Sequence, residues 1–226
     1  MTKSESENTQ RFFDAVKAGD LASDKALLDG NPGLVHARGE RGESAVLLAI
    51  YYGRESVKEL LLSRGVELDI FAAAATGKAD RVAELLSGDA SLANAYAPDG
   101  FTPLGLAAFF GHRSLVDLLL RRAADINAIS RNATGYTALT GAVAHGNTEI
   151  VATLLAAGAN VNHRYGQGYS PLHEAASSGK VEITRLLLDH GADPNAPTDD
   201  GQTPLAMALA KGHDEVAALL RRHGAA

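Results

Sequence analysis

The 226-residue sequence contains no cysteine, which excludes disulfide bonds and any zinc site built on cysteine ligands. No apolar run approaches the length of a membrane span, and the polar start MTKSESENTQ lacks the apolar segment of a secretory signal. Basic residues are not concentrated, and the net charge of −6 argues against a nucleic-acid partner. These absences favour a cytoplasmic protein without membrane contact. We expect the first seven residues to form a loose tail.

The sequence repeats itself at regular intervals. Glycines recur at positions 111, 146, 179 and 212, which are 33 to 35 residues apart. An apolar stripe at helical spacing follows each glycine, as in SLVDLLLRR and EIVATLLAA, and small residues such as Ala107-Ala108 and Ala175-Ala176 lie in the helix before it. Three units begin with a hydroxyl residue that can cap a helix and a proline that suits its first position, at 102–103, 170–171 and 203–204. The pattern predicts pairs of short helices joined by turns.

These motifs resemble the ankyrin repeat, and the match is strongest in SPLHEAA (170–176) and HGADPNA (190–196). The regularly placed glycines and prolines interrupt the helical pattern, which excludes a coiled coil as the alternative. The resemblance implies an all-α repeat solenoid, in which helix pairs stack in a curved array and β-hairpin fingers project from it. The family usually binds other proteins on the concave face. We expect a single domain of seven repeats, at 8–38, 39–67, 68–96, 97–131, 132–164, 165–197 and 198–226.

Two segments depart from the repeat pattern. Gly53 and Gly77 are only 24 residues apart, and the intervening SRGVELDIFAAAATG lacks both the Thr-Pro-Leu start and the turn motif. We therefore expect the finger between repeats 2 and 3 to be missing or reduced to a tight connection, with Asp69 as the N-cap of the next helix. The loop AISRNATGY before repeat 5 is two residues longer than its counterparts, which predicts a longer or bulged finger. Such an insertion can carry function or be neutral drift.

The sequence offers no constellation of catalytic or metal-binding residues. Its eight histidines are scattered along the repeats without metal-ligand spacing. We expect His112 and His213 to make loop hydrogen bonds, and the resemblance implies that His173 links neighbouring fingers. GQGY at 166–169 lacks the strand and helix of a phosphate loop, and the Ser-x-x-Lys string at 177–180 crosses a helix end. We therefore predict no enzyme activity, no metal site and no cofactor.

Aromatic residues make up only 5% of the chain, so their positions are informative. Tyr51-Tyr52 and Phe109-Phe110 both precede a helix-ending glycine, at positions that face the concave surface in the family. His145 occupies the same position in repeat 5. Two repeats span roughly 20 Å, so the doublets would form the walls of a notch at repeat 3. Adjacent helical positions point about 100° apart, so one ring of each doublet can pack while the other is exposed.

A second row of aromatic residues precedes the capping residues of repeats 4, 5 and 6. Aromatic side chains give large contact areas and often anchor interfaces, although they can also merely cover a neighbouring repeat. The predicted partner-binding residues are Tyr51, Tyr52, Phe101, Phe109, Phe110, Tyr136, His145 and Tyr169. We expect a monomeric scaffold for another protein. The alternative is a binder of a small ligand or a peptide tail at the notch.

Overall fold

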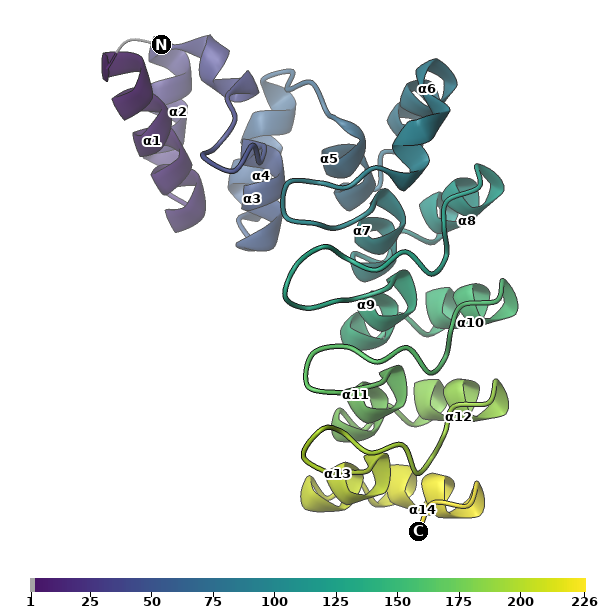
Figure 1. Cartoon of the computed structure of the whole chain (residues 1–226). Coiled ribbons are helices and arrows are strands. Elements are labelled where there is room, and N and C mark those ends of the chain that lie inside the picture. The colour runs from purple at the N-terminus through teal and green to yellow at the C-terminus, as the bar shows by residue number, and fades with distance from the viewer. Residues whose placement is uncertain (1–2) are drawn as a thin grey trace.

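The computed structural model describes residues 3–226, which form a continuous stack of helix pairs, α1 with α2 through to α13 with α14 (Figure 1). The α-helices are α1 Lys3–Ala18, α2 Leu21–Gly30, α3 Ala45–Tyr51, α4 Glu55–Ser63, α5 Ile70–Ala75, α6 Ala79–Gly88, α7 Pro103–Phe109, α8 Arg113–Arg121, α9 Ala138–His145, α10 Thr148–Ala156, α11 Pro171–Ser177, α12 Val181–Asp189, α13 Pro204–Ala210 and α14 Asp214–Arg222. Two 3-10 helices, η1 Pro32–His36 and η2 Ala90–Asn94, follow α2 and α6. The predicted all-α solenoid is confirmed. None of these helices is long and apolar enough to cross a membrane.

Projecting loops, the fingers, precede most odd-numbered helices. They span residues 38–44, 97–101, 130–136, 165–169 and 198–202, and backbone hydrogen bonds between their ends close them. In the described residues only the first and fourth contain a β-bridge, so these fingers are hydrogen-bonded turns rather than long hairpins. The third finger closes between Ser130 and Tyr136, two residues further apart than the ends of its neighbours.

The helices begin where the sequence places capping residues. Thr102 accepts a hydrogen bond from the backbone N–H of Gly105 at 3.1 Å. The Asp69 carboxylate accepts bonds from two N–H groups of α5, the shorter at 2.8 Å from Ala72. These bonds satisfy N–H groups that have no partner within the helix. The predicted N-caps at these two residues are confirmed.

Residues at the start of the even-numbered helices link each helix pair to the preceding one. The imidazoles of His112 and His213 bond the carbonyl oxygens of Ala75 and Ser177 at 3.0 and 3.1 Å. Both predicted loop hydrogen bonds are confirmed. Arg54, Asn147 and Lys180 donate in the same way to carbonyls at the ends of α1, α7 and α9. These bonds satisfy carbonyl groups at helix C-termini, which otherwise lack partners.

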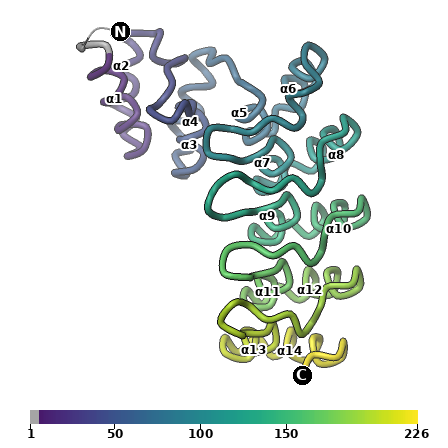
Figure 2. The backbone as a smooth tube through the Cα atoms, viewed as in Figure 1, coloured from purple at the N-terminus to yellow at the C-terminus, as the bar shows by residue number. Residues whose placement is uncertain are grey.

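The array bends where the chain connects α4 to α5 (Figures 1 and 2). Residues 64–69 form no finger, and the fingers on either side approach each other: a Cβ atom on Gly42 would lie 3.4 Å from Cγ of Pro98. On the opposite side α4 and α6 are splayed apart, and a cavity of about 620 Å³ lies beside the connection, lined by 66–68 and 77–81. The missing finger therefore shortens the inner side of the stack and bends it toward the fingers.

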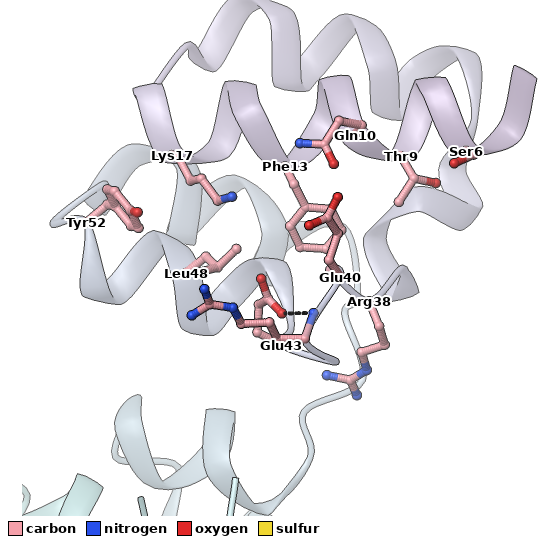
Figure 3. A pocket seen from close by; sticks show the side chains of 12 residues that line it. Ser6, Thr9, Gln10, Phe13, Lys17, Arg38, Glu40, Glu43, Leu48 and Tyr52 are labelled. Carbon is pink, nitrogen blue, oxygen red and sulfur yellow. Dashed lines mark hydrogen bonds between the residues drawn. The ribbon is translucent and has the colours of Figure 1, made fainter. Parts of the chain in front are cut away.

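Helix α1 corrects the expectation of a loose tail. The helix begins at Lys3, so the expectation is wrong for residues 3–7, whereas residues 1–2 lie outside the described part. Burial of Phe12 and Val16 anchors this helix against the stack and lets it extend into the polar segment. Its exposed side and the first finger enclose a polar cavity of about 440 Å³ (Figure 3).

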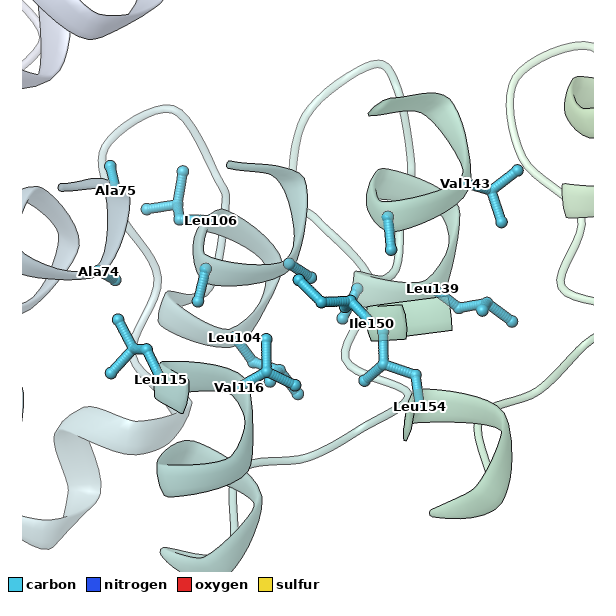
Figure 4. Packing of buried hydrophobic residues seen from close by; sticks show 14 of the residues in the cluster. Ala74, Ala75, Leu104, Leu106, Leu115, Val116, Leu139, Val143, Ile150 and Leu154 are labelled. Carbon is cyan, nitrogen blue, oxygen red and sulfur yellow. The ribbon is translucent and has the colours of Figure 1, made fainter. Parts of the chain in front are cut away.

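Small and branched apolar side chains form one continuous core between the two rows of helices (Figure 4). Leu104, Leu139 and Leu154 are fully buried, and α5 contributes the buried run Ala72–Ala75. Alanines let α5 lie close to the helices on both sides because they add little volume. The core therefore holds the odd-numbered helices, and the side chains at their ends, in fixed relative positions.

Candidate functional site

The aromatic doublets of α3 and α7 meet at the inner side of the bend. The rings of Tyr51 and Phe110 stack with centroids 6.2 Å apart and planes at 23°. The expectation of two walls about 20 Å apart is therefore wrong. The six-residue helix α5 and the missing finger allow the ends of α3 and α7 to converge across repeat 3.

The four rings of the doublets differ in exposure and partners. Tyr51 is 37% exposed and Tyr52 50% exposed, so both tyrosines are accessible. Tyr52 lies apart from the stacked rings and lines the polar cavity with Lys17 (Figure 3). Phe109 and Phe110 are half-buried and pack edge to face at 5.1 Å. The structure therefore brings Tyr51, Phe109 and Phe110 together and leaves Tyr52 separate.

The finger aromatics form a second group. Tyr165 packs edge to face on Tyr136 at 4.9 Å and lies 6.3 Å from the ring of Tyr169. Sequence reasoning missed Tyr165, although it is the residue directly opposite Tyr169 in a five-residue finger. Phe101 joins the two groups, because it lines a small crevice together with Phe109 and Tyr136.

His145 extends the first group, with its imidazole 5.2 Å from the ring of Phe109. The two groups together form a band, which we name the aromatic stripe. The aromatic stripe consists of Tyr51, Phe101, Phe109, Phe110, Tyr136, His145, Tyr165 and Tyr169. All the predicted residues except Tyr52 belong to it. Its residues lie at the ends of α3, α7 and α9 and in the fingers that precede α7, α9 and α11.

Carboxylates lie beside the tyrosines of the stripe. Although Tyr51 is partly exposed, burial raises its pKa, and a hydrogen bond with the Asp99 carboxylate together with the charge of that carboxylate raises the pKa further. Burial, and to a smaller extent the negative charge of Glu174, likewise raises the pKa of Tyr136 and Tyr165. These hydroxyls are therefore neutral over the physiological pH range, and the stripe presents apolar ring surface next to negative charge.

The cavities along the stripe are small. The larger has a volume of about 210 Å³ and is lined by Ile50, Tyr51, Phe101, Gly105, Leu106, Phe109 and Phe110. The crevice between Phe109 and Tyr136 has only about 10 Å³. The stripe therefore offers one recess of side-chain size on a largely open surface.

Outside the stripe, the buried histidine His173 has a structural role. His173 accepts a hydrogen bond at Nδ1 from the backbone N–H of Ser170 and contacts the Gln202 carbonyl through Nε2, so it links α11 to the next finger as the resemblance implies. Burial lowers its pKa and keeps it neutral. Among residues 6–226, whose side chains the structure describes, there is no group of three or more His, Cys, Asp or Glu that could hold a metal ion.

Comparison with known proteins identifies the repeats. The family model described as ankyrin repeats in three copies matches residues 70–165 and 160–226, more than half of the chain. Mouse ankyrin repeat and SAM domain-containing protein 6 is 43% identical over 90 residues, 40% of this chain. Ankyrin repeat protein nuc-2 of Neurospora crassa is 30% identical over 160 residues, 66% of this chain. The probable E3 ubiquitin-protein ligase XBOS31 of Oryza sativa subsp. japonica is 39% identical over 93 residues, 41% of this chain.

The similarity covers small parts of these relatives. The matched segments span 10%, 15% and 20% of the lengths of the mouse, Neurospora and rice proteins. What this chain shares with them is therefore a set of repeats.

Proposed function

Because the chain belongs to the ankyrin repeat family, we propose that it is a scaffold that binds another protein along its aromatic stripe. Ankyrin repeats generally mediate protein–protein interaction. The observation that carries the proposal is the position of the stripe on the inner side of the bend, where its rings lie together from α3 to α11. Rings held in place by their neighbours lose little entropy on binding and are effective anchors.

The shape of the stripe supports a protein partner more than a small ligand. Small-molecule sites have volumes of roughly 300–1,000 Å³ and enclose most of the ligand. The largest recess of the stripe has about 210 Å³. A partner chain can instead lie across the open surface and insert one side chain into this recess.

The remaining parts of the proposal follow from the sequence. The scaffold is a cytoplasmic monomer whose single domain consists of the seven repeats outlined above. It has no catalytic activity and uses no cofactor. Its partner is neither nucleic acid nor membrane, which agrees with the net charge of −6.

Affinity capture from the native cell with matched variants tests the proposal. Tyr51→Ala and Phe110→Ala each remove a ring of the aromatic stripe, and Leu21→Ala removes a side chain that is 41% exposed on α2. We expect each aromatic variant to reduce capture of the partner by about tenfold or more, a loss typical of interface anchors. We expect Tyr51→Ala to change the Tm by no more than about 4 °C, because its side chain is 37% exposed and substitutions at the surface alter stability little.

The control variant separates specific from general effects. Leu21→Ala should retain the captured partner. Retention of the partner by both aromatic variants would refute the proposal, and so would an equal loss in Leu21→Ala. A large fall in the Tm of Tyr51→Ala would show that this ring has a packing role instead.

A further inference from the structure

Neighbouring fingers contact one another through a recurrent position. In every finger a backbone N–H donates across the ends and closes the turn. The residue directly after that donor is here called the docking residue. The docking residues of the first to the fifth finger are Glu40, Pro98, Arg131, Gly166 and Asp199. Those of the first, third and fifth fingers carry charged side chains.

The docking residue of the fifth finger makes three contacts with the fourth finger and its flank. The N–H of Asp199 donates to the Gln167 carbonyl at 3.0 Å. Its carboxylate pairs at 3.0 Å with Arg164, which lies directly before the fourth finger. The same guanidinium donates to the Pro197 carbonyl at 2.7 Å. One arginine thus bridges two acceptors, and the carbonyl three residues after it accepts the docking N–H.

The third finger uses its docking residue in a similar way. The N–H of Arg131 donates to the Gly100 carbonyl of the second finger at 2.9 Å. The guanidinium carbon lies 3.7 Å from the ring centroid of Tyr96, which lies directly before the second finger. In both pairs of fingers, the docking residue therefore engages the preceding finger with its N–H and the residue before that finger with its side chain.

The docking residue of the first finger has no preceding finger to engage. The N–H and the carboxylate of Glu40 correspond to those of Asp199, and the Arg38 carbonyl corresponds to that of Pro197. Within the part of the chain that the structure describes, none of these three groups of the first finger has a hydrogen-bond partner or an ion pair. Glu40 is also exposed. The first finger therefore presents the full set of docking groups to the surroundings.

The polar cavity lies on the side of the first finger where a preceding finger would lie. Helix α1 has 16 residues and α3 has 7, so the first turns of α1 replace a finger. The cavity of about 440 Å³ between α1 and the first finger is lined by Arg38 and Glu40. Figure 3 shows the Glu40 side chain pointing from the first finger toward α1. The docking groups thus border a space that a turn of another chain can enter.

We propose that the polar cavity binds a turn of the partner protein that carries an arginine. The guanidinium bonds the Glu40 carboxylate and the Arg38 carbonyl, and the main-chain carbonyl three residues after the arginine accepts the Glu40 N–H. The turn thus takes the place that the fourth finger has beside the fifth. This inference rests on the proposed scaffold function and specifies the chemistry of its partner. Tyr52 lines the same cavity and follows Tyr51 of the aromatic stripe, so a partner bound along the stripe can reach it.

The arrangement of the acceptors selects arginine, although cations also line the cavity. Arg38 uses its guanidinium to pair with Asp69 at 2.8 Å. Lys17 and Arg41 form no ion pair among the described residues, so the Glu40 carboxylate stays available to a partner's cation. A carboxylate and a carbonyl two residues before it suit the planar fork of a guanidinium, whereas lysine offers a single ammonium group.

Titration of the full chain with two cyclic peptides tests the site. The first has the sequence of residues 163–170, HRYGQGYS, closed head to tail so that it keeps a turn, and the second has citrulline in place of the arginine. Citrulline has nearly the shape of arginine but carries no charge. Binding is followed by the NMR shift of the Glu40 backbone N–H. We expect the arginine peptide to bind about tenfold more tightly than the citrulline peptide, and added NaCl to weaken only the arginine peptide.

Two variants locate the contact. Glu40→Gln should weaken binding of the arginine peptide by about tenfold and leave binding of the citrulline peptide unchanged. The matched control Glu59→Gln alters an exposed carboxylate of α4 and should change neither. Equal binding of the two peptides, or arginine-peptide binding that Glu40→Gln leaves unaffected, would overturn the arginine assignment. Absence of a shift at Glu40 with both peptides would overturn the docking site itself.

Partner capture separates this inference from the proposed function. If the partner is lost from Tyr51→Ala and Phe110→Ala while the arginine peptide fails to bind the wild-type chain, the scaffold function stands and the arginine site is wrong. Binding of the arginine peptide at Glu40, with capture unchanged in both aromatic variants, would support the site and refute the stripe.

Discussion

Replacing Asp24 with asparagine should stabilise the protein at neutral pH. Asp24 is 0% exposed in α2, and neither of its carboxylate oxygens has a hydrogen-bond partner. It lies four residues after the N-cap, where α6 and α8 have the buried Val82 and Val116. A carboxylate thus occupies a position that is apolar in other repeats, and its ionised form is poorly solvated.

The size and sign of the effect follow from the pKa. Burial, together with repulsion from Asp20, raises the pKa of Asp24 from 3.8 to about 6. The folded state therefore binds this proton more tightly than the unfolded state does. The resulting stabilisation is fully present below pH 3.8 and is lost as the pH rises through 6. The difference between the two pKa values corresponds to roughly 3 kcal/mol.

Urea unfolding followed by circular dichroism measures this difference. At pH 7.5 we expect Asp24→Asn to be more stable than the wild type by about 1–3 kcal/mol, because the amide remains without a partner but carries no charge. The advantage should shrink as the pH falls from 6 toward 4. The control Asp80→Asn removes an exposed carboxylate of α6 and should change stability by less than about 0.5 kcal/mol. An advantage of Asp24→Asn that is absent at pH 7.5, or equal at pH 4.5 and 7.5, would refute the reasoning.

Two further substitutions test the contacts around the fingers. Gly100→Ala should lower the free energy of unfolding in urea by about 2 kcal/mol more than Gly201→Ala does. Both glycines have positive φ, but only at Gly100 would a Cβ atom lie 2.8 Å from the Arg131 carbonyl carbon. Equal losses of stability in the two variants would contradict this. His173→Ala should cost about 1–3 kcal/mol at pH 7.5, because it leaves the buried Ser170 N–H without its acceptor and removes one contact to the Gln202 carbonyl. Because burial lowers the pKa of His173, its contribution is present above pH 6.5 and should decline as the pH falls below that value; a loss that is independent of pH would contradict this.

Much of the fold could be predicted because its signals are local. The hydroxyl of Thr102 and the carboxylate of Asp69 cap helices through N–H groups two or three residues away, so the capping residue and the helix start lie in the same short segment. The imidazoles of His112 and His213 bond the neighbouring repeat because every repeat places this position against the end of the previous first helix. The start of α1 was missed because its polar residues carry no apolar period, and its helical state depends on the burial of Phe12 and Val16.

The candidate site could be predicted only in part. Repeat positions identified most of the rings, since an equivalent position in each repeat faces the same side of the stack. The distance between the two aromatic doublets could not be predicted, because the expectation assumed evenly stacked repeats. Tyr165 was missed because it precedes the position that was compared between repeats, and only the turn of the finger brings it against Tyr136.

The sequence by itself determined the repeat, its helix pairs and the place where a finger is absent, since each of these depends on residues close together in the chain. Only the tertiary structure decided how the missing finger changes the stack. The inner side of the stack contracts, so the rings of Tyr51 and Phe110 meet across repeat 3, and the Asp99 carboxylate comes to lie beside the Tyr51 hydroxyl. These contacts join segments about 50 to 60 residues apart, and no local pattern specifies them because they depend on the accumulated geometry of the helices between.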